Sequence, residues 1–263
     1  MESLAGLRER RAFECRLTPS RALLTLGEAE AFLRDRGLLT RTPDGALPSL
    51  FEACHEQPYQ PGGRGFATWP ATKWPWFGEL GERGYLITAV HRGKSLLVTG
   101  EMADVLDPVC RAEIERMRAA DAGWRRLLDH LAAVGPSSPD DLRTELRLTR
   151  QELKSLRAPL ERRGAVVSRS VEVPAGEGHL HTSELSRWDQ VHPGGAAADP
   201  GRAFRDLIVA GVRAAVVAPE RELPRWFSWP WHWTGTLVDD LVREGRLRRA
   251  GDHVTPGFSV PPT

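Results

Sequence analysis

Cysteine is scarce in this sequence: the three that occur, Cys15, Cys54 and Cys110, are odd in number and widely spaced. This spacing provides neither the paired cysteines of a disulfide framework nor the closely spaced ligands of a zinc knuckle. Scarce cysteine is also typical of a reduced intracellular compartment. We therefore expect a core held by side-chain packing, and 263 residues with 41% hydrophobic content suit roughly two domains.

Long apolar runs are missing as well. No stretch is apolar over enough length to span a bilayer, and residues 1–13 lack the apolar centre of a signal peptide. We expect a cytoplasmic protein with no membrane partner. The sequence also lacks a strong net charge, because 36 lysines and arginines nearly balance 35 aspartates and glutamates. No overall electrostatic field draws the molecule to nucleic acid, so any binding to nucleic acid depends on the local distribution of charge.

What the sequence does contain is an internal repeat, in which residues 155–167 recur as residues 236–248. The matching pairs are Ser155 with Thr236, Leu156 with Leu237, Leu160 with Leu241, Arg162 with Arg243, Gly164 with Gly245 and Val166 with Leu247. In each copy two leucines four residues apart stack on one helix face, and a glycine four residues later can adopt the left-handed conformation that ends a helix. An alternating strand follows. The pattern is typical of the third helix and wing of a winged helix-turn-helix unit.

Helices that would open such a unit precede the first copy. Residues 124–134 have apolar side chains at helical spacing, and Ser138, followed by proline, is a good N-cap for a short second helix. Thr149 has the capping-box spacing that begins a third helix. Pro159 lies inside that helix and removes a backbone donor, so we expect a kink or a break near Arg157. A similar pattern precedes the second copy.

The remaining segments complete the predicted organisation. Apolar runs at 85–90 and 95–99, joined by a basic turn, predict a β-hairpin, and the glycine-rich and proline-rich residues 174–201 predict a linker. We therefore expect an α+β fold, mainly α, with tandem winged helix-turn-helix units and an N-terminal α/β portion that carries the hairpin. The expected divisions are 1–120, a helix and β-hairpin region with a divergent winged helix as the alternative; 121–173, a winged helix; 174–201, a linker with a short anchoring piece; and 202–263, a winged helix.

Basic residues gather on the predicted third helix and on the wings. In a helix-turn-helix protein this helix enters the major groove, and the wing lies along the backbone or in the minor groove. Double-stranded DNA is therefore the expected partner, with a solvated helix surface as the alternative. Asp239 and Asp240 argue against the second copy's helix lying on phosphate. The candidate DNA-binding residues are Arg92, Lys94, Arg150, Gln151, Lys154, Arg157, Arg162, Arg163, Arg169, Arg246, Arg248 and Arg249.

Catalytic and metal-binding patterns are weaker. Glu52, His55 and Glu56 are predicted to share a helix, which would make an acid and base set, with an ordinary helix surface as the alternative. His179 and His181 lack a third ligand at suitable spacing, so we expect no metal and no cofactor.

Residues 226–233 form a run of tryptophan and phenylalanine interrupted by proline. Aromatic side chains can stack on extruded or single-stranded bases. Packing between domains is the more frequent use of such a run, because it buries a large surface at low entropy cost. We favour packing.

The tandem units, the wing endings GAVVSR and GRLRRAGDHV, and the LSRWD segment at 185–189 resemble the AlkZ/YcaQ superfamily of winged-helix DNA glycosylases, especially its AlkZ-related branch. LPSLFEACHE, the tryptophan-rich loop and HRGK carry the resemblance in the N-terminal half. It implies a role in DNA repair, by hydrolysis of the N-glycosidic bond of bulky alkylated purines. The family's catalytic motif is a glutamine, an aliphatic residue, then glutamine or aspartate. The glutamines at positions 57, 60, 151 and 190 do not form it, so no catalytic residue is carried over.

Two other functions fit the same pattern. A transcription regulator would read a defined operator through the winged helices, and its N-terminal half would sense a ligand or dimerise. A protein-interaction module would use the winged helices to pack on other proteins, for which a nearly neutral chain is suitable. We favour a monomer.

Overall fold

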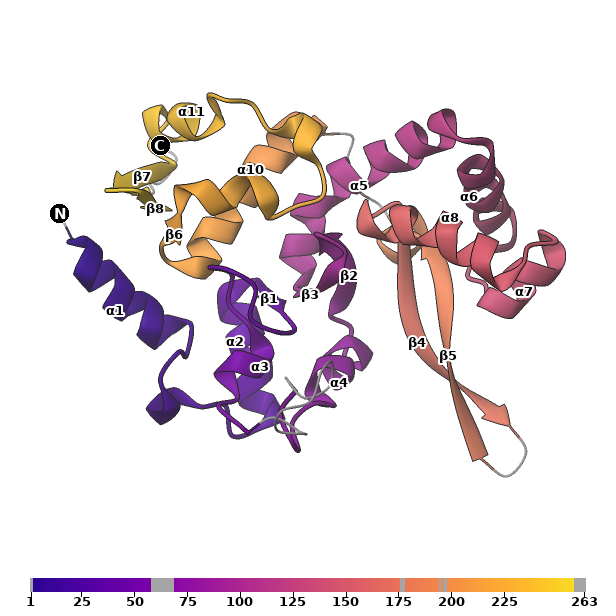
Figure 1. Ribbon diagram of the computed structural model, residues 1–263, viewed down its shortest axis with the longest axis horizontal. Helices are drawn as coiled ribbons and strands as arrows, with labels where there is room; N and C mark the ends of the chain where they lie inside the picture. The colour runs from indigo at the N-terminus through magenta and orange to yellow at the C-terminus, as the bar shows by residue number, and fades with distance from the viewer. Residues whose placement is uncertain (1, 58–68, 176–177, 194, 196–197, 258–263) are drawn as a thin grey trace.

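The computed structural model describes residues 2–57, 69–175, 178–193, 195 and 198–257. Helices and small antiparallel sheets make up the chain, which confirms the expected α+β, mainly α fold class. Figure 1 shows three groups of elements arranged around the long helix α5 (Gly100–Ala120), which lies near the centre of the view. In the ranges that the structure describes, no helix is long and apolar enough to cross a bilayer.

The first group precedes α5. Its elements are α1 (Leu4–Glu14), η1 (Pro19–Arg21), α2 (Leu26–Arg36), β1 (Leu38–Thr40), α3 (Leu50–Ala53), α4 (Trp76–Glu82), β2 (Leu86–His91) and β3 (Lys94–Val98). Thr25 caps α2 by accepting a hydrogen bond from the backbone N–H of Glu28 (3.2 Å), and Gly37 ends the helix at a φ of 79°. The sheet has the order β1-β3-β2, and both pairings are antiparallel.

The second group follows α5. Its elements are α6 (Ala122–Val134), α7 (Pro139–Glu145), α8 (Arg150–Arg162), β4 (Val166–Ala175), β5 (Gly178–Arg187) and α9 (Trp188–Val191). The caps expected from the sequence form, since Ser138 caps α7, and Thr149 and Glu152 make a capping box at the start of α8. Ser137 forms a bridge with Leu185, so a very short first strand lies beside β5.

The third group ends the described chain. Its elements are α10 (Pro200–Ala215), β6 (Ala218–Pro219), η3 (Glu220–Arg225), η4 (Pro230–His232), α11 (Leu237–Arg243), β7 (Leu247–Ala250) and β8 (His253–Pro256). The sheet order is β6-β8-β7.

All three groups contain one element order: a helix, a short strand, two or three further helices or helical turns, and a hairpin whose second strand pairs with the short strand. This is the order of a winged helix, and we refer to residues 26–98, 122–187 and 200–256 as the first, second and third units. A glycine of positive φ follows the third helix of each unit: Gly84 (97°), Gly164 (73°) and Gly245 (71°). The helix and glycine of the sequence repeat therefore occur three times.

Two segments differ from the sequence-based expectation. Residues 174–175 and 178–187, expected to begin a linker, instead continue the hairpin of the second unit, because β4 and β5 pair residue by residue from Val166 with Arg187 to Ala175 with Gly178. This hairpin projects beyond the helical body in Figure 1. Of the kink or break expected near Arg157, the break does not occur, since α8 runs as one helix from Arg150 to Arg162.

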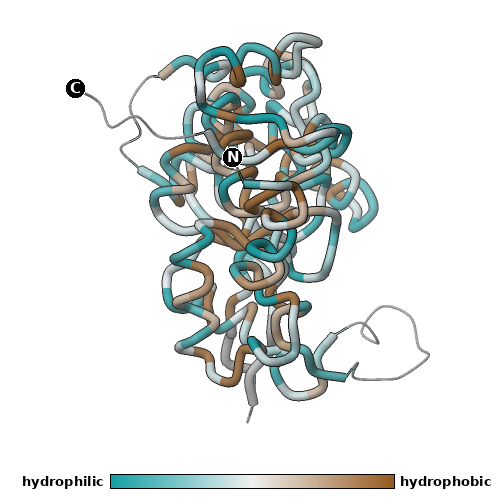
Figure 2. The backbone as a smooth tube through the Cα atoms, turned by 90° about the vertical axis from the view of Figure 1, so that its left-hand side faces the viewer, coloured by the Kyte–Doolittle hydropathy of each residue, from teal (hydrophilic) through white to brown (hydrophobic). Residues whose placement is uncertain are grey.

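The sheet of the first unit separates two hydrophobic cores. Its alternating side chains face opposite ways, so Leu96 and Val98 of β3 join the larger core while Leu97 joins the smaller one with α2 and α4. The larger core continues through α5 into both other units. Figure 2 shows the hydrophobic segments concentrated inside the body.

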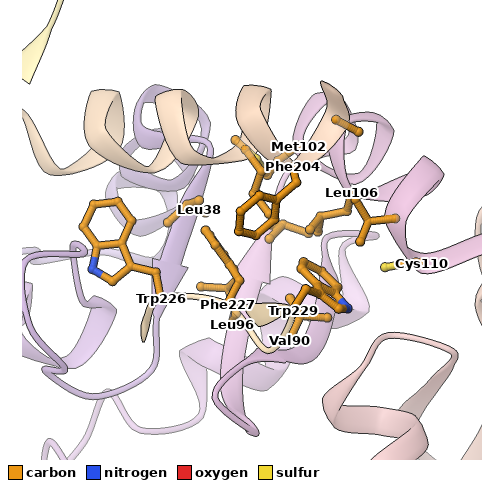
Figure 3. Close-up of a cluster of buried hydrophobic side chains, with 14 of the residues drawn as sticks. Leu38, Val90, Leu96, Met102, Leu106, Cys110, Phe204, Trp226, Phe227 and Trp229 are labelled. Carbon is orange, nitrogen blue, oxygen red and sulfur yellow. The ribbon is translucent and has the colours of Figure 1, made fainter. Parts of the chain in front are cut away.

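The aromatic run belongs to this larger core. Trp226 is 1% exposed and Trp229 is fully buried, and Figure 3 shows them with Phe227 beneath Phe204 of α10, close to side chains of α5 and the first sheet. The packing interpretation of this run is therefore confirmed for these side chains.

Candidate nucleic-acid interface

The first half of α8 presents an unpaired basic face. Leu153 and Leu160 are buried against the core, which turns Arg150, Gln151 and Lys154 outward, and all three are exposed. In the part of the chain that the structure describes, neither Arg150 nor Lys154 makes an ion pair or a side-chain hydrogen bond. Their charges are therefore available to a partner.

The second half of α8 is different. Arg157 is half-buried and pairs with Glu161 one turn later, at 3.2 Å between Nε and Oε1. Glu161 also accepts a hydrogen bond from the Ser168 hydroxyl on β4, so the pair ties the helix to its own wing. Arg162 is exposed, whereas Arg163 is half-buried and its guanidinium lies 4.2 Å from the ring centroid of Trp231. Of the predicted α8 residues, Arg157 has a structural partner within the unit.

The wing of the second unit carries Arg169, which is exposed on β4. This wing is ten residues long on each strand and extends away from α8 (Figure 1). At about 3.3 Å per residue, each strand spans about 30 Å.

The turn between β2 and β3 gathers cations around one carboxylate. Asp44 accepts hydrogen bonds from Nε2 of His91 (2.9 Å) and Nζ of Lys94 (3.0 Å), and it also pairs with Arg92. Burial raises the pKa of Asp44, but the hydrogen bonds from Lys94 and His91 outweigh it and hold that pKa below its usual value. The predicted tip residues Arg92 and Lys94 are thus brought together, and a carboxylate not foreseen from the sequence partly neutralises them.

A cleft of about 600 Å³ opens where the three units meet. It is lined by Arg92, Ala158, Pro159, Arg162, Arg163, Pro224, Arg225, Phe227, Ser228 and Pro230. Four of these are arginines and none is acidic, and they come from the β2–β3 turn, the end of α8 and the segment around η3 and η4. Sequence reasoning singled out three of the arginines but missed Arg225 and Ser228. Only folding brings these positions together, so no local pattern marks them.

The wing of the third unit is neutralised by its own unit. Arg249 binds Glu220 at 2.8 Å and Asp239 at 2.7 Å, and these hydrogen bonds raise the pKa of its guanidinium. Arg246 pairs with Asp206 of α10. Arg248 is half-buried. Arg246 and Arg249 therefore lie near carboxylates of α10, η3 and α11, which weakens the field that they present to a phosphate.

The candidate catalytic set does not share a helix, and this prediction is wrong. Helix α3 ends at Ala53, and His55 adopts a φ of 46°, so Glu52 and Glu56 are not on one helical face. The His55 ring is 2.6 Å from the carbonyl of Arg16.

Glu56 has a structural role in the same region. It accepts hydrogen bonds from the backbone N–H groups of Thr72 (2.8 Å) and Lys73 (3.1 Å) and from the Thr72 hydroxyl. Burial raises the pKa of Glu56, and these bonds more than offset it, leaving that pKa below its usual value. The carboxylate anchors a loop, and neither it nor His55 lines the arginine cleft.

These observations define a mainly helical protein in which three units with winged-helix element order share one core. Among solved structures, the chain is similar to Streptomyces sahachiroi DNA glycosylase AlkZ, with a TM-score of 0.58 and 14% identity, covering 97% of this chain and 70% of that chain. The AlkZ-like relationship that the sequence resemblance implied is therefore confirmed at the level of the fold. No family model matches the chain, and no curated protein matches it.

Proposed function

We propose that this chain is a cytoplasmic, monomeric protein that binds duplex DNA and acts in DNA repair. The observation that carries the proposal is the first half of α8, where Arg150, Gln151 and Lys154 are exposed at the start of the helix that enters the major groove in helix-turn-helix proteins. The fold shared with a DNA glycosylase supports the same conclusion.

On this proposal, the two basic elements of the second unit have separate tasks. The start of α8 lies against base edges and flanking phosphates, while the long wing that carries Arg169 follows the backbone. Since most of the binding energy then comes from phosphate contacts, affinity should depend little on sequence and should fall steeply with salt, by about 0.9 log units per log unit of salt for each phosphate neutralised.

Changing Arg150 and Lys154 together to alanine tests this interface. The expected result is weaker duplex binding. The slope of the logarithm of the binding constant against the logarithm of the salt concentration should also become shallower by up to about two. Fluorescence anisotropy over a series of salt concentrations measures both quantities. Both side chains are exposed, so the variant should keep the stability of the parent.

A matched control removes two other exposed cations, Arg8 on α1 and Arg34 on α2. This Arg8→Ala, Arg34→Ala variant should bind duplex as the parent does. An unchanged affinity in the α8 variant would take this helix out of the interface and overturn the proposal.

Repair chemistry requires its own experiment. The purified protein is incubated with duplexes that carry N7-alkylguanine or N3-alkyladenine, and abasic sites are detected by strand cleavage in alkali. If the chain hydrolyses the N-glycosidic bond, abasic sites accumulate on these duplexes and not on unmodified ones. If no abasic site forms while the duplex still binds, the activity is excluded for these lesions and only the binding role stands.

A further inference from the structure

The arginine cleft carries more positive charge than its carboxylate neighbours neutralise. Among the described residues, Arg162 and Arg225 make no ion pair. Arg92 pairs with Asp44, but Asp44 is shared with Lys94 and His91. A cleft that leaves positive charges unpaired is suited to an anion.

The fourth arginine also shares its carboxylate. Arg163 lies 3.9 Å from Glu113, and Glu113 is already held by Arg116 at 2.7 Å. Both guanidinium groups lie against Trp231, at 4.0 Å for Arg116 and 4.2 Å for Arg163. The indole ring thus fixes the direction of Arg163 while the single carboxylate leaves the pair positively charged.

Buried polar atoms at this cleft lack partners. Ser228 is 8% exposed, and its hydroxyl makes no hydrogen bond within the described chain. Nη1 of Arg163 and Nε of Arg92 are buried without a hydrogen-bond acceptor too. Buried donors without acceptors are uncommon because each one loses its hydration. Three buried donors without acceptors therefore belong to residues that line this cleft.

The backbone around these donors is held by contacts between units. The backbone N–H of Ser228 donates to the carbonyl of Val90 (3.0 Å), and Nε1 of Trp229 donates to the carbonyl of Arg163 (3.2 Å). Since each bond joins the third unit to another unit, the cleft has a fixed shape before any ligand enters.

We propose that this cleft binds a phosphate group, held by the guanidinium groups of Arg162, Arg163 and Arg225 and the hydroxyl of Ser228. Guanidinium matches phosphate oxygens with pairs of parallel hydrogen bonds, and a serine hydroxyl supplies a further donor. Under the proposed function, the bound phosphate belongs to a phosphodiester of the DNA backbone. This choice of source rests on the proposed function, whereas the phosphate chemistry of the cleft does not. A free phosphate ester is the other source.

The first test replaces Arg162 and Arg225 together with glutamine and measures the thermal midpoint in sodium phosphate against sodium chloride of equal ionic strength. Phosphate should raise the midpoint of the parent, and this increase should disappear in the variant. The control, Arg8→Gln with Arg34→Gln, should keep the full increase.

The second test measures duplex binding over a range of salt. If the arginines share one phosphate, the salt slope of the Arg162→Gln, Arg225→Gln variant should be shallower than that of the parent by about 0.9. Adding Ser228→Ala should not reduce the slope further. This value differs from the loss of up to about two expected from Arg150 and Lys154, which lie one helical turn apart and meet different phosphates.

Ser228→Ala alone separates binding from stability. Because the hydroxyl has no hydrogen-bond partner among the described residues, its removal should leave the thermal midpoint in chloride unchanged or slightly higher. The concentration of phosphate needed for half of the increase should rise several-fold. A lower midpoint in chloride together with unchanged phosphate binding would show that Ser228 serves the fold and would remove it from the site.

The two tests together distinguish the outcomes. If the glutamine variant loses both the increase in thermal midpoint and part of the duplex salt slope, the result supports a backbone phosphodiester. If only the duplex salt slope falls, the result supports a phosphodiester that binds only as part of the DNA chain. A phosphate effect on a chain that binds no duplex supports the cleft with a free phosphate ester while the proposed function fails. If the glutamine variant equals the parent in both measurements, the phosphate site is overturned.

Discussion

Replacing Gly164 with alanine is expected to lower the free energy of unfolding by about 2–5 kcal/mol, whereas the same change at Gly245 should lower it by only about 1–2 kcal/mol. The two glycines follow the third helices of the second and third units and have almost the same φ, 73° and 71°. Each substitution therefore incurs the same backbone strain, because an alanine side chain disfavours the left-handed region.

The surroundings of the two glycines account for the difference. A Cβ atom at Gly164 would lie 2.5 Å from Sγ of Cys110 on α5 and 3.0 Å from Cγ1 of Val90 on β2. A Cβ atom at Gly245 would meet nothing within 4 Å. Urea unfolding of the two variants measures the comparison. Equal losses would contradict the close packing of the second unit on α5 and the first sheet.

Trp229→Ala is expected to lower the free energy of unfolding by about 3–5 kcal/mol, the usual cost of deleting a buried tryptophan. Trp229 is fully buried, and its ring stacks with Phe227 at 6.2 Å between centroids. Its indole N–H donates to the carbonyl of Arg163 in the second unit. The loss combines a cavity in the shared core with a broken contact between units.

Trp229→Phe serves as the control, because it keeps an aromatic ring and removes only the donor and part of the volume. We expect a loss of about 1–3 kcal/mol for this variant. Unfolding followed by circular dichroism in urea gives both values. If Trp229→Ala cost less than 1 kcal/mol, the aromatic run would not hold the units together.

The sequence predicted the second and third units because their third helices end in the same way. Leucines four apart followed by glycine make a local pattern that survives without tertiary contacts. The first unit is expected from the sequence only as the alternative of a divergent winged helix, because α3 spans only Leu50–Ala53 and α4 (Trp76–Glu82) follows a segment rich in tryptophan, proline and glycine. Elements so short leave too few positions for a hydrophobic period to be recognised.

The long wing and the arginine cleft could not be predicted for a different reason. Proline and glycine within residues 174–201 predicted a linker, and only the pairing of ten residues on each strand of β4 and β5 makes the start of that segment a hairpin. Arg225 and Ser228 meet Arg92 and Arg162 through folding alone. A local sequence pattern predicts the secondary structure of one segment, whereas the cleft depends on how three segments pack together in the fold.

The core that runs through all three units has a consequence for the partner. Most of the buried side chains of the second and third units belong to one cluster with α5, so neither unit could swing without exposing apolar surface to water. Rotation of one unit against another therefore carries a large free-energy cost. When a double helix docks, we expect the nucleic acid to supply the deformation, so that easily bent or locally weakened stretches of duplex are favoured over stiff ones.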